Sequence, residues 1–219
     1  EANNDKKEIM LFATRAMNVL FAIALGLLIL HWATELFGRL AGIFAIAIYA
    51  AEPTIIAYSS LFMMEIGFSF FSTLALYTLW KFLKKPTKIT WTCAAIALGL
   101  VQLTKHTAIF LFGIYPIIIL AHSWLTRKTL QKTISHLTSF AGMIFVAILL
   151  INIVYGFQGS FQTANEMFEK DKTIDKTFYT TEKLYSNKPV LKFIAENIPL
   201  PLPYHYVKGL GYVIVEAKS

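Results

Sequence analysis

Six long apolar segments, separated by short polar connections, limit what this 219-residue chain can fold into. A helix needs about 20 apolar residues to cross the roughly 30 Å hydrocarbon core of a bilayer, and fewer when interfacial residues flank it. The second segment is interrupted at its end by Glu52-Pro53, because proline removes a backbone donor and disfavours helix before it. The expected membrane-spanning helices are residues 9–32, 40–51, 66–83, 89–104, 107–124 and 134–155.

The composition supports a membrane protein. Hydrophobic residues make up 56% of the chain and charged residues 15%, against about 25% charged in a soluble domain. We therefore expect an all-α membrane protein with about six transmembrane helices in antiparallel hairpins over residues 1–156. Residues 157–219 are too polar and charged to span, and are expected to form an extracytoplasmic loop region. The chain has neither an initiator Met nor a signal-peptide pattern, so we expect it to be an incomplete piece of a longer protein.

The basic residues predict which ends of the helices face the cytoplasm. Cytoplasmic loops are enriched in Lys and Arg, and two of the connections carry most of these residues. The two basic connections contain Lys81, Lys84, Lys85 and Lys88 in the first, and Arg127, Lys128 and Lys132 in the second. The opposite, outer side then receives the N-terminus, residues 52–65, the Lys105-His106 turn and the tail. The protein is expected to be a multi-pass protein of the plasma or cytoplasmic membrane.

The net charge of +7 is explained by this topology, so no nucleic-acid partner is predicted. A single cysteine, Cys93, excludes an internal disulfide and any site built from several cysteines. The five histidines lack the spacing of metal ligands, so no metal site is predicted, and the sequence does not identify a cofactor. Motifs of soluble enzymes, such as a P-loop or HExxH, do not occur in the sequence.

Four ionisable residues at the outer boundary of the spans are candidates for chemistry: Arg15, Glu65, Lys105 and His106. Such groups cost roughly 2.5–3.5 kcal/mol each on insertion scales, so they usually have a partner or a function. No other acidic residue occurs between Glu65 and Glu166. One interpretation is plain interfacial anchoring, with long basic side chains reaching the headgroups and Glu65 favoured at a helix N-terminus. The other is an outward-facing polar site in which cations hold a phosphate and a carboxylate handles a proton.

Several stretches of the sequence, taken in order, resemble one enzyme family. They are Glu35-Leu36-Phe37-Gly38-Arg39-Leu40-Ala41-Gly42 after Arg15, Glu52-Pro53-Thr54-Ile55-Ile56-Ala57-Tyr58 followed by Met64-Glu65, Gly99-Leu100-Val101-Gln102-Leu103-Thr104-Lys105, and Leu200-Pro201-Leu202-Pro203-Tyr204 with Gly209-Leu210. Together they resemble the membrane-embedded glycosyltransferases of the GT-C class that use lipid-linked sugars. The nearest group is family 39, with the protein O-mannosyltransferases and aminoarabinose transferases.

This resemblance implies a function and a site. It implies transfer of a sugar from a polyprenyl or dolichyl phosphate to an acceptor hydroxyl, on a protein or a glycolipid, at the extracytoplasmic face. The principal catalytic Asp of the family would precede Glu1, so the fragment alone is expected to be inactive. Glu65 is the accessory catalytic candidate, and Arg15, Tyr58, Lys105 and His106 are the substrate-binding candidates. Two positions depart from the family, since Glu65 follows Met where Thr-Asp is common and Tyr58 replaces a frequent His.

Two other functions stay open at this stage. A transporter is possible for any multi-span chain, although transporters tend to show broken helices and inverted repeats. A non-catalytic membrane scaffold is the other. In the tail, the pattern predicts helices near residues 163–170 and 189–197, an extended stretch across Pro199, Pro201 and Pro203, and a short strand at residues 212–215.

Overall fold

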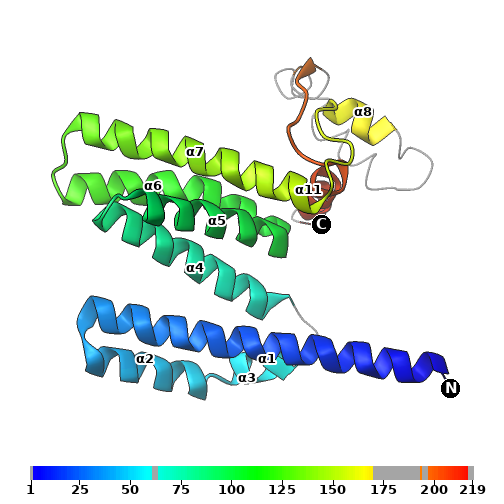
Figure 1. Ribbon diagram of the computed structural model, residues 1–219, viewed down its shortest axis with the longest axis horizontal. Helices are drawn as coiled ribbons and strands as arrows, with labels where there is room; N and C mark the ends of the chain where they lie inside the picture. The colour runs from blue at the N-terminus through cyan, green and yellow to red at the C-terminus, as the bar shows by residue number, and fades with distance from the viewer. Residues whose placement is uncertain (1, 61–63, 170–192, 194–196, 217–219) are drawn as a thin grey trace. The chain divides into compact units, whose positions relative to one another are not determined.

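The computed structural model is predominantly helical in the residues that it describes, which are 2–60, 64–169, 193 and 197–216. Figure 1 shows the helices, which fall into two compact units, Glu1–Lys105 and His106–Ser219. The first unit contains α1 (Ala2–Phe37), α2 (Arg39–Ala51), α3 (Pro53–Ser60), α4 (Glu65–Lys84) and α5 (Lys88–Thr104). The second contains the 3₁₀ helix η1 (His106–Phe110), α6 (Leu111–Leu125), α7 (Leu130–Val154), α8 (Ala164–Glu169) and α11 (Tyr204–Glu216).

In the first unit, α1 and α2 form a tight antiparallel hairpin (Figure 1). Gly38 joins them with φ of 93°, a conformation that glycine adopts without steric cost. Gly42 lets the helices approach closely, since a Cβ atom there would lie 2.0 Å from Oγ1 of Thr34. Near the other end of the hairpin, the hydroxyl of Tyr49 donates a hydrogen bond of 2.8 Å to the carbonyl of Ala22.

The Glu52-Pro53 break occurs where the sequence predicts it. Helix α2 ends at Ala51, Glu52 is extended, and Pro53 begins α3, a position where its missing N–H costs nothing. Residues 53–60 thus form a short helix, which the sequence analysis did not predict. The side chain of Glu52 accepts a hydrogen bond of 2.8 Å from the hydroxyl of Thr54 and so holds the start of α3.

A second hairpin, α4 and α5, packs through small residues. Thr87 caps α5 through a reciprocal hydrogen-bond pair with Thr90. The buried face of α5 includes Ala94, Ala95 and Leu98, each fully buried. Helix α4 also contacts α1. Because an α4–α5 hairpin reverses direction, the N-terminus of α4 lies at the same end as the C-terminus of α5.

In the second unit, α6 and α7 form a hairpin and the tail folds back on its open end. Asn152 of α7 is buried, and its amide donates to the carbonyl of Pro201 at 2.9 Å. An isolated bridge pairs Thr163 with Pro199, so the predicted extended stretch is found at its start, whereas residues 201 and 202 form a bend. Thr163 and Glu166 cap α8 reciprocally, which confirms the helix predicted there.

Two other predictions for the tail were not confirmed. The strand predicted at residues 212–215 is wrong, since these residues belong to α11. A strand needs a neighbour to pair with, whereas α11 contacts η1 and buries Tyr206 and Val207. The helix predicted at residues 189–197 lies almost wholly outside the described residues.

All six predicted segments are helical, and the chain is an all-α membrane protein. Among the described residues, four helices are long and apolar enough to cross a bilayer: Glu8–Phe37, Glu65–Lys84, His106–Leu125 and Leu130–Val154. Arg39–Ala51 and Lys88–Thr104 are apolar but shorter, so the expected number of six crossings stays a prediction. Large exposed side chains on these helices, such as Ile48 at 71% and Phe145 at 68%, suit contact with lipid.

Candidate functional site

An ion pair joins two of the charged candidates, Glu65 and Lys105, at the open end of the α4–α5 hairpin. The ammonium of Lys105 lies 3.0 Å from Oε1 of Glu65, although the residues are 40 positions apart. The hairpin produces this meeting, because α4 starts at Glu65 and α5 ends at Thr104. The extended conformation of Lys105, with φ of −155° and ψ of 137°, stops the helix at the residue that carries the charge.

The pair is accessible. The side chains of Lys105 and Glu65 are 39% and 43% exposed, respectively. In water, ion pairs this exposed contribute roughly 0.2–1 kcal/mol to stability. Glu65 also lies in the first turn of α4, where the helix dipole favours a carboxylate. The two charges are thus held in place by helix ends and remain available to a ligand.

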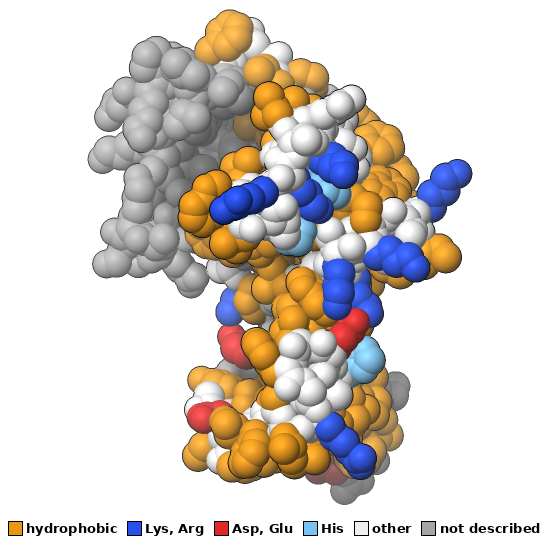
Figure 2. Space-filling model, turned by 90° about the vertical axis from the view of Figure 1, so that its left-hand side faces the viewer, with side chains coloured by type: hydrophobic (Ala, Val, Ile, Leu, Met, Phe, Trp, Pro, Cys, Tyr) orange, Lys and Arg blue, Asp and Glu red, His pale blue; other side chains and the backbone are white. Residues whose placement is uncertain are grey.

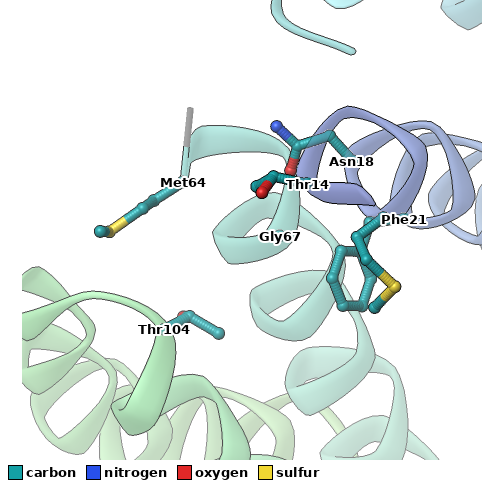
Figure 3. A pocket seen from close by; sticks show the side chains of 7 residues that line it. Thr14, Asn18, Phe21, Met64, Gly67 and Thr104 are labelled. Atoms are coloured by element: carbon teal, nitrogen blue, oxygen red, sulfur yellow. The ribbon is translucent and has the colours of Figure 1, made fainter. Parts of the chain in front are cut away.

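A pocket of about 340 Å³ opens within the first unit beside this pair (Figure 3). Its wall is mostly apolar, with a few polar groups from α1 and the end of α5. The lining residues are Thr14, Met17, Asn18, Phe21, Met64, Gly67 and Thr104. Met64 directly precedes Glu65 and Thr104 directly precedes Lys105, so the ion pair borders the pocket through its chain neighbours. Figure 3 shows Thr14 and Asn18 on α1 beside Gly67 of α4.

Gly67 of α4 lines the pocket without filling it. A Cβ atom at Gly67 would find its nearest neighbour, Cδ2 of Phe21, at 3.8 Å, an ordinary contact distance. A methyl group therefore fits there, whereas a large side chain would occupy the pocket. The hydroxyls of Thr14 and Thr104 donate to the carbonyls of Met10 and Val101, at 2.7 Å each, which leaves their oxygens able to accept.

A second ion pair lies at the opposite end of α4. The ammonium of Lys81 lies 2.6 Å from Oε1 of Glu35 on α1. The hydroxyl of Tyr77 donates to Oε2 of Glu35 at 3.3 Å, and Nε2 of His31 lies 3.0 Å from the same hydroxyl. The rings of Tyr77 and Trp80 lie 5.6 and 5.8 Å from the Lys81 ammonium. Thr14 of α1 lies near Gly67 at the start of α4, and Glu35 near the end of α1 pairs with Lys81 near the end of α4. The two helices therefore run in the same direction.

A comparison with protein families decides the class of the chain. The family model described as dolichyl-phosphate-mannose-protein mannosyltransferase matches residues 8–151, which is more than half of the chain. The chain belongs to this family. No curated protein and no solved structure matches it. Membership of the dolichyl-phosphate-mannose-protein mannosyltransferase family makes the protein a mannosyltransferase-like membrane glycosyltransferase of the GT-C type.

The matched region contains the whole site built above, from Thr14 to Lys105. Of the predicted site residues, the structure brings together Glu65 and Lys105. Arg15 is exposed on α1, and its guanidinium forms no ion pair or side-chain hydrogen bond within the described residues. Tyr58 is half-buried on α3 and does not line the pocket.

His106 begins the second unit of this mannosyltransferase-like chain. Its ring packs against that of Tyr206 of α11, with the centroids 5.3 Å apart and the planes tilted by 44°. A Cβ atom at Gly209 would lie 2.0 Å from Nε2 of His106, so α11 approaches the imidazole as closely as glycine permits. Nε2 of His106 is buried and has no hydrogen-bond partner among the described residues.

The sequence analysis missed the uncharged residues of the pocket. Asn18 is 8% exposed inside an apolar helix, three residues after Arg15. A polar amide at that depth is itself a signal, because burying it unpaired is costly. Thr14, Gly67 and Thr104 carry no comparable signal, since such residues are common in membrane helices. Among the described residues, no group of three or more His, Cys, Asp or Glu side chains is placed to hold a metal ion.

Proposed function

We propose that the protein transfers a sugar from a dolichyl or polyprenyl phosphate to an acceptor hydroxyl at the extracytoplasmic face of the membrane. The observation that supports this most is the accessible Glu65–Lys105 pair at the border of a mostly apolar pocket. A lipid-linked donor presents the same combination, a phosphate joined to an apolar chain. The acceptor is a protein or a glycolipid in this proposal, and membership of a protein mannosyltransferase family favours a protein.

Lys105 is proposed to bind the phosphate of the donor. As the glycosidic bond breaks, the leaving phosphate gains negative charge, and a fixed cation stabilises that charge. Helix α5 ends at Thr104, so the backbone holds Lys105 at the boundary where a headgroup would lie. The pocket is proposed to accommodate the first part of the lipid chain, because Met17, Phe21 and Met64 give its wall an apolar character.

Glu65 is proposed to act on the acceptor side. With no donor bound, its carboxylate is engaged by Lys105 at 3.0 Å. A phosphate on Lys105 would compete for the ammonium and free a carboxylate oxygen for the acceptor hydroxyl. The carboxylate could then orient that hydroxyl or assist its deprotonation. Glu65 has an accessory role in this proposal, and deprotonation of the acceptor does not depend on it alone.

The remaining candidates have more distant roles in this proposal. Arg15 supplies a second cation on α1, one residue after Thr14 of the pocket wall. Tyr58 on α3 offers a hydroxyl on the same predicted outer side of the membrane as Lys105. His106 follows Lys105 directly, and its packing against α11 fixes the chain just beyond the phosphate-binding cation. The basic connections at the other ends of the helices support the extracytoplasmic placement.

The test compares four variants of the intact protein in native-like membranes: Lys105→Ala, Lys105→Arg, Glu65→Gln and Lys88→Ala. Mannose transfer from dolichyl-phosphate-mannose to an acceptor peptide is measured, with a label that reports donor binding. Lys105→Ala is expected to lose donor binding, Lys105→Arg to keep part of it, and Glu65→Gln to bind donor but transfer slowly. Lys88→Ala is the matched control, since it removes a cation from the other end of α5. Wild-type transfer by both Lys105→Ala and Glu65→Gln would overturn the proposal.

A further inference from the structure

The loop after α7 turns sharply, through four residues with positive φ within residues 156–161. Two of them are glycines, Gly156 with φ of 62° and Gly159 with φ of 69°. The other two are Phe157 with φ of 56° and Phe161 with φ of 64°. Glycine adopts this conformation without steric cost, whereas a bulky side chain rarely does. The loop thus places two phenylalanines at positions where the backbone alone would favour glycine.

Backbone hydrogen bonds fix both phenylalanines in this conformation. The N–H of Phe157 donates to the carbonyl of Asn152 at 2.9 Å, across the turn that ends α7. The N–H of Phe161 donates to the carbonyl of Leu200 at 2.8 Å. Both side chains nevertheless stay outside the core, since Phe157 is 49% exposed and Phe161 is 65% exposed. Strained residues that the surrounding structure fixes concentrate at functional sites, so these exposed rings indicate a contact with something outside the chain.

The exposed rings continue the apolar outer side of α7. Phe145, Leu149 and Ile153 recur every four residues along this helix, and they are 68%, 40% and 57% exposed. Side chains with this spacing share one face of a helix, and the buried side includes Met143 at 0%. On a membrane-spanning helix, an exposed apolar face is in contact with acyl chains. Phe157 follows Ile153 by four residues, so this apolar surface extends past the end of the helix into the loop.

The length of α7 places this loop at the membrane surface. At 1.5 Å per residue, its 25 residues measure about 37 Å. That is more than the roughly 30 Å of the hydrocarbon core and less than the roughly 40–45 Å that include the headgroups, so the ends of the helix lie in the headgroup layer. No Lys, Arg, Asp or Glu occurs between Lys132 and Glu166. The loop therefore carries no charge that would keep it in bulk water.

The two ends of α7 present different surfaces. The α6–α7 connection contains Arg127, Lys128 and Lys132, and Lys and Arg side chains gather on the face that contains it (Figure 2). Basic side chains of this kind extend toward phosphates and water. The loop at residues 156–161 presents uncharged aromatic rings instead, which favour the boundary between headgroups and acyl chains.

We propose that residues 156–161 bind the phospholipid bilayer, with the rings of Phe157 and Phe161 inserted between the headgroups and the acyl chains. The partner is the lipid surface and not a particular headgroup, because the loop carries no charge. The tail is attached to this loop, since the N–H of Tyr204 at the start of α11 donates to the carbonyl of Gln158 at 3.0 Å. Insertion of the two rings thus holds α11 at the membrane surface, independently of the proposed sugar transfer.

The first test measures membrane depth in the intact protein, reconstituted in phosphatidylcholine bilayers. Cys93→Ser removes the single cysteine, and a nitroxide is attached at Phe157→Cys, Phe161→Cys or, as control, Glu166→Cys. EPR compares relaxation by oxygen, which concentrates among acyl chains, with relaxation by a water-soluble nickel chelate. The labels at 157 and 161 should favour oxygen, and the label at the exposed Glu166 should favour nickel. Equal access of nickel to all three overturns the proposal, as does shielding of 157 and 161 from both reagents, which would indicate a protein partner.

The second test separates insertion of the rings from the conformation of the loop. Phe157→Gly combined with Phe161→Gly removes both rings and keeps the left-handed backbone, because glycine suits positive φ. Tm in detergent should therefore stay close to wild type, whereas hydrogen exchange of α11 in bilayers should become about tenfold faster as the tail loses its attachment to the membrane. Gln158→Ala, the matched control in the same loop, should exchange as wild type. Unchanged exchange in the double variant, or equal acceleration in Gln158→Ala, would contradict the proposal.

Discussion

The two ends of α4 each carry a Glu–Lys ion pair, but the surroundings of the two pairs differ. Glu35 and Lys81 are 26% and 37% exposed, and they share contacts with the hydroxyl of Tyr77 and the ring of Trp80. Glu65 and Lys105 are 43% and 39% exposed, and they border an open pocket instead of aromatic rings. The same two residue types thus occur once inside a packed cluster and once at the edge of a cavity.

This difference teaches how to separate a structural pair from a functional one within a single fold. A pair whose atoms are already engaged by further hydrogen bonds and aromatic rings holds helices together, because a ligand would have to replace those contacts. A pair with open sides can exchange one partner for a ligand. We therefore interpret the Glu35–Lys81 cluster, with His31, Tyr77 and Trp80, as a structural contact that stabilises the packing of α1 against α4.

The largest contrast is expected between Lys105→Ala and Lys81→Ala. Removing a cation that stabilises developing charge typically lowers turnover by about 10²–10³-fold, so Lys105→Ala should lose transfer to that extent. Lys81→Ala should transfer at nearly the wild-type rate per folded molecule. Initial rates, normalised to detergent-stable protein, measure both. Equal losses in the two variants would show that the ends of α4 do not differ in function.

A change in the pocket wall is expected to have the next largest effect. Gly67→Phe should lower transfer by about tenfold or more, because its ring would occupy space beside the Glu65–Lys105 pair and displace the donor. Gly67→Ala is the matched control, since a methyl group there meets its nearest neighbour at 3.8 Å. The KM for dolichyl-phosphate-mannose is the decisive measurement. An unchanged KM in Gly67→Phe would mean that the donor does not enter this pocket.

Glu35→Gln should affect stability and leave transfer unchanged. The substitution removes the carboxylate charge that Lys81 pairs with and weakens its hydrogen bond from Tyr77. We expect Tm to fall by about 2–4 °C, measured by a thermal-shift assay in detergent. Glu65→Gln, as the counterpart at the other end, should leave Tm almost unchanged while slowing transfer. If Glu35→Gln slowed transfer and Glu65→Gln lowered Tm, the Glu35–Lys81 pair would be the functional one and the Glu65–Lys105 pair the structural one.

The smallest effect is expected from Tyr77→Phe. This variant keeps the ring that lies 5.6 Å from the Lys81 ammonium and removes the hydroxyl that bonds Glu35. Tm should fall by about 1–2 °C, because one hydrogen bond contributes less than a charge pair together with its bonds. Combining Tyr77→Phe with Glu35→Gln should give less than the sum of the two shifts, since both remove the same bond. Additive shifts would indicate that the hydroxyl acts independently of Glu35.

The sequence predicts most of the fold because apolar runs and helix stops are local signals. Glu52-Pro53 ends α2 and Thr163-x-x-Glu166 caps α8, as their residue types dictate. The error at residues 212–215 has a non-local cause. Tyr212 and its β-branched neighbours suit a strand, but the packing of Tyr206 and Val207 beside η1 makes the segment a helix.

The site was only partly predictable from the sequence. Glu65 and Lys105 could be found because each is an isolated charge at a helix end, and the hairpin then brings them together. The pocket could not, since it depends on how α1 rotates against α4. Arg15 is one residue beyond Thr14, about 100° around the helix, so the neutral residue faces the pocket and the charged one is exposed. Helix rotation of this kind is set by packing and not by composition.

The lengths of the helices also bear on the membrane around the protein. At 1.5 Å per residue, the 17 residues of α5 measure about 26 Å and the 13 of α2 about 20 Å, below the roughly 30 Å of the hydrocarbon core. A bilayer adjusts to short hydrophobic segments by becoming locally thinner. If α5 crosses the bilayer, as the sequence predicts, Lys105 directly after its end lies where the lipid surface dips. A lipid-linked sugar would find its headgroup drawn toward this cation by hydrophobic mismatch, so the thickness of the surrounding membrane should itself tune the reaction.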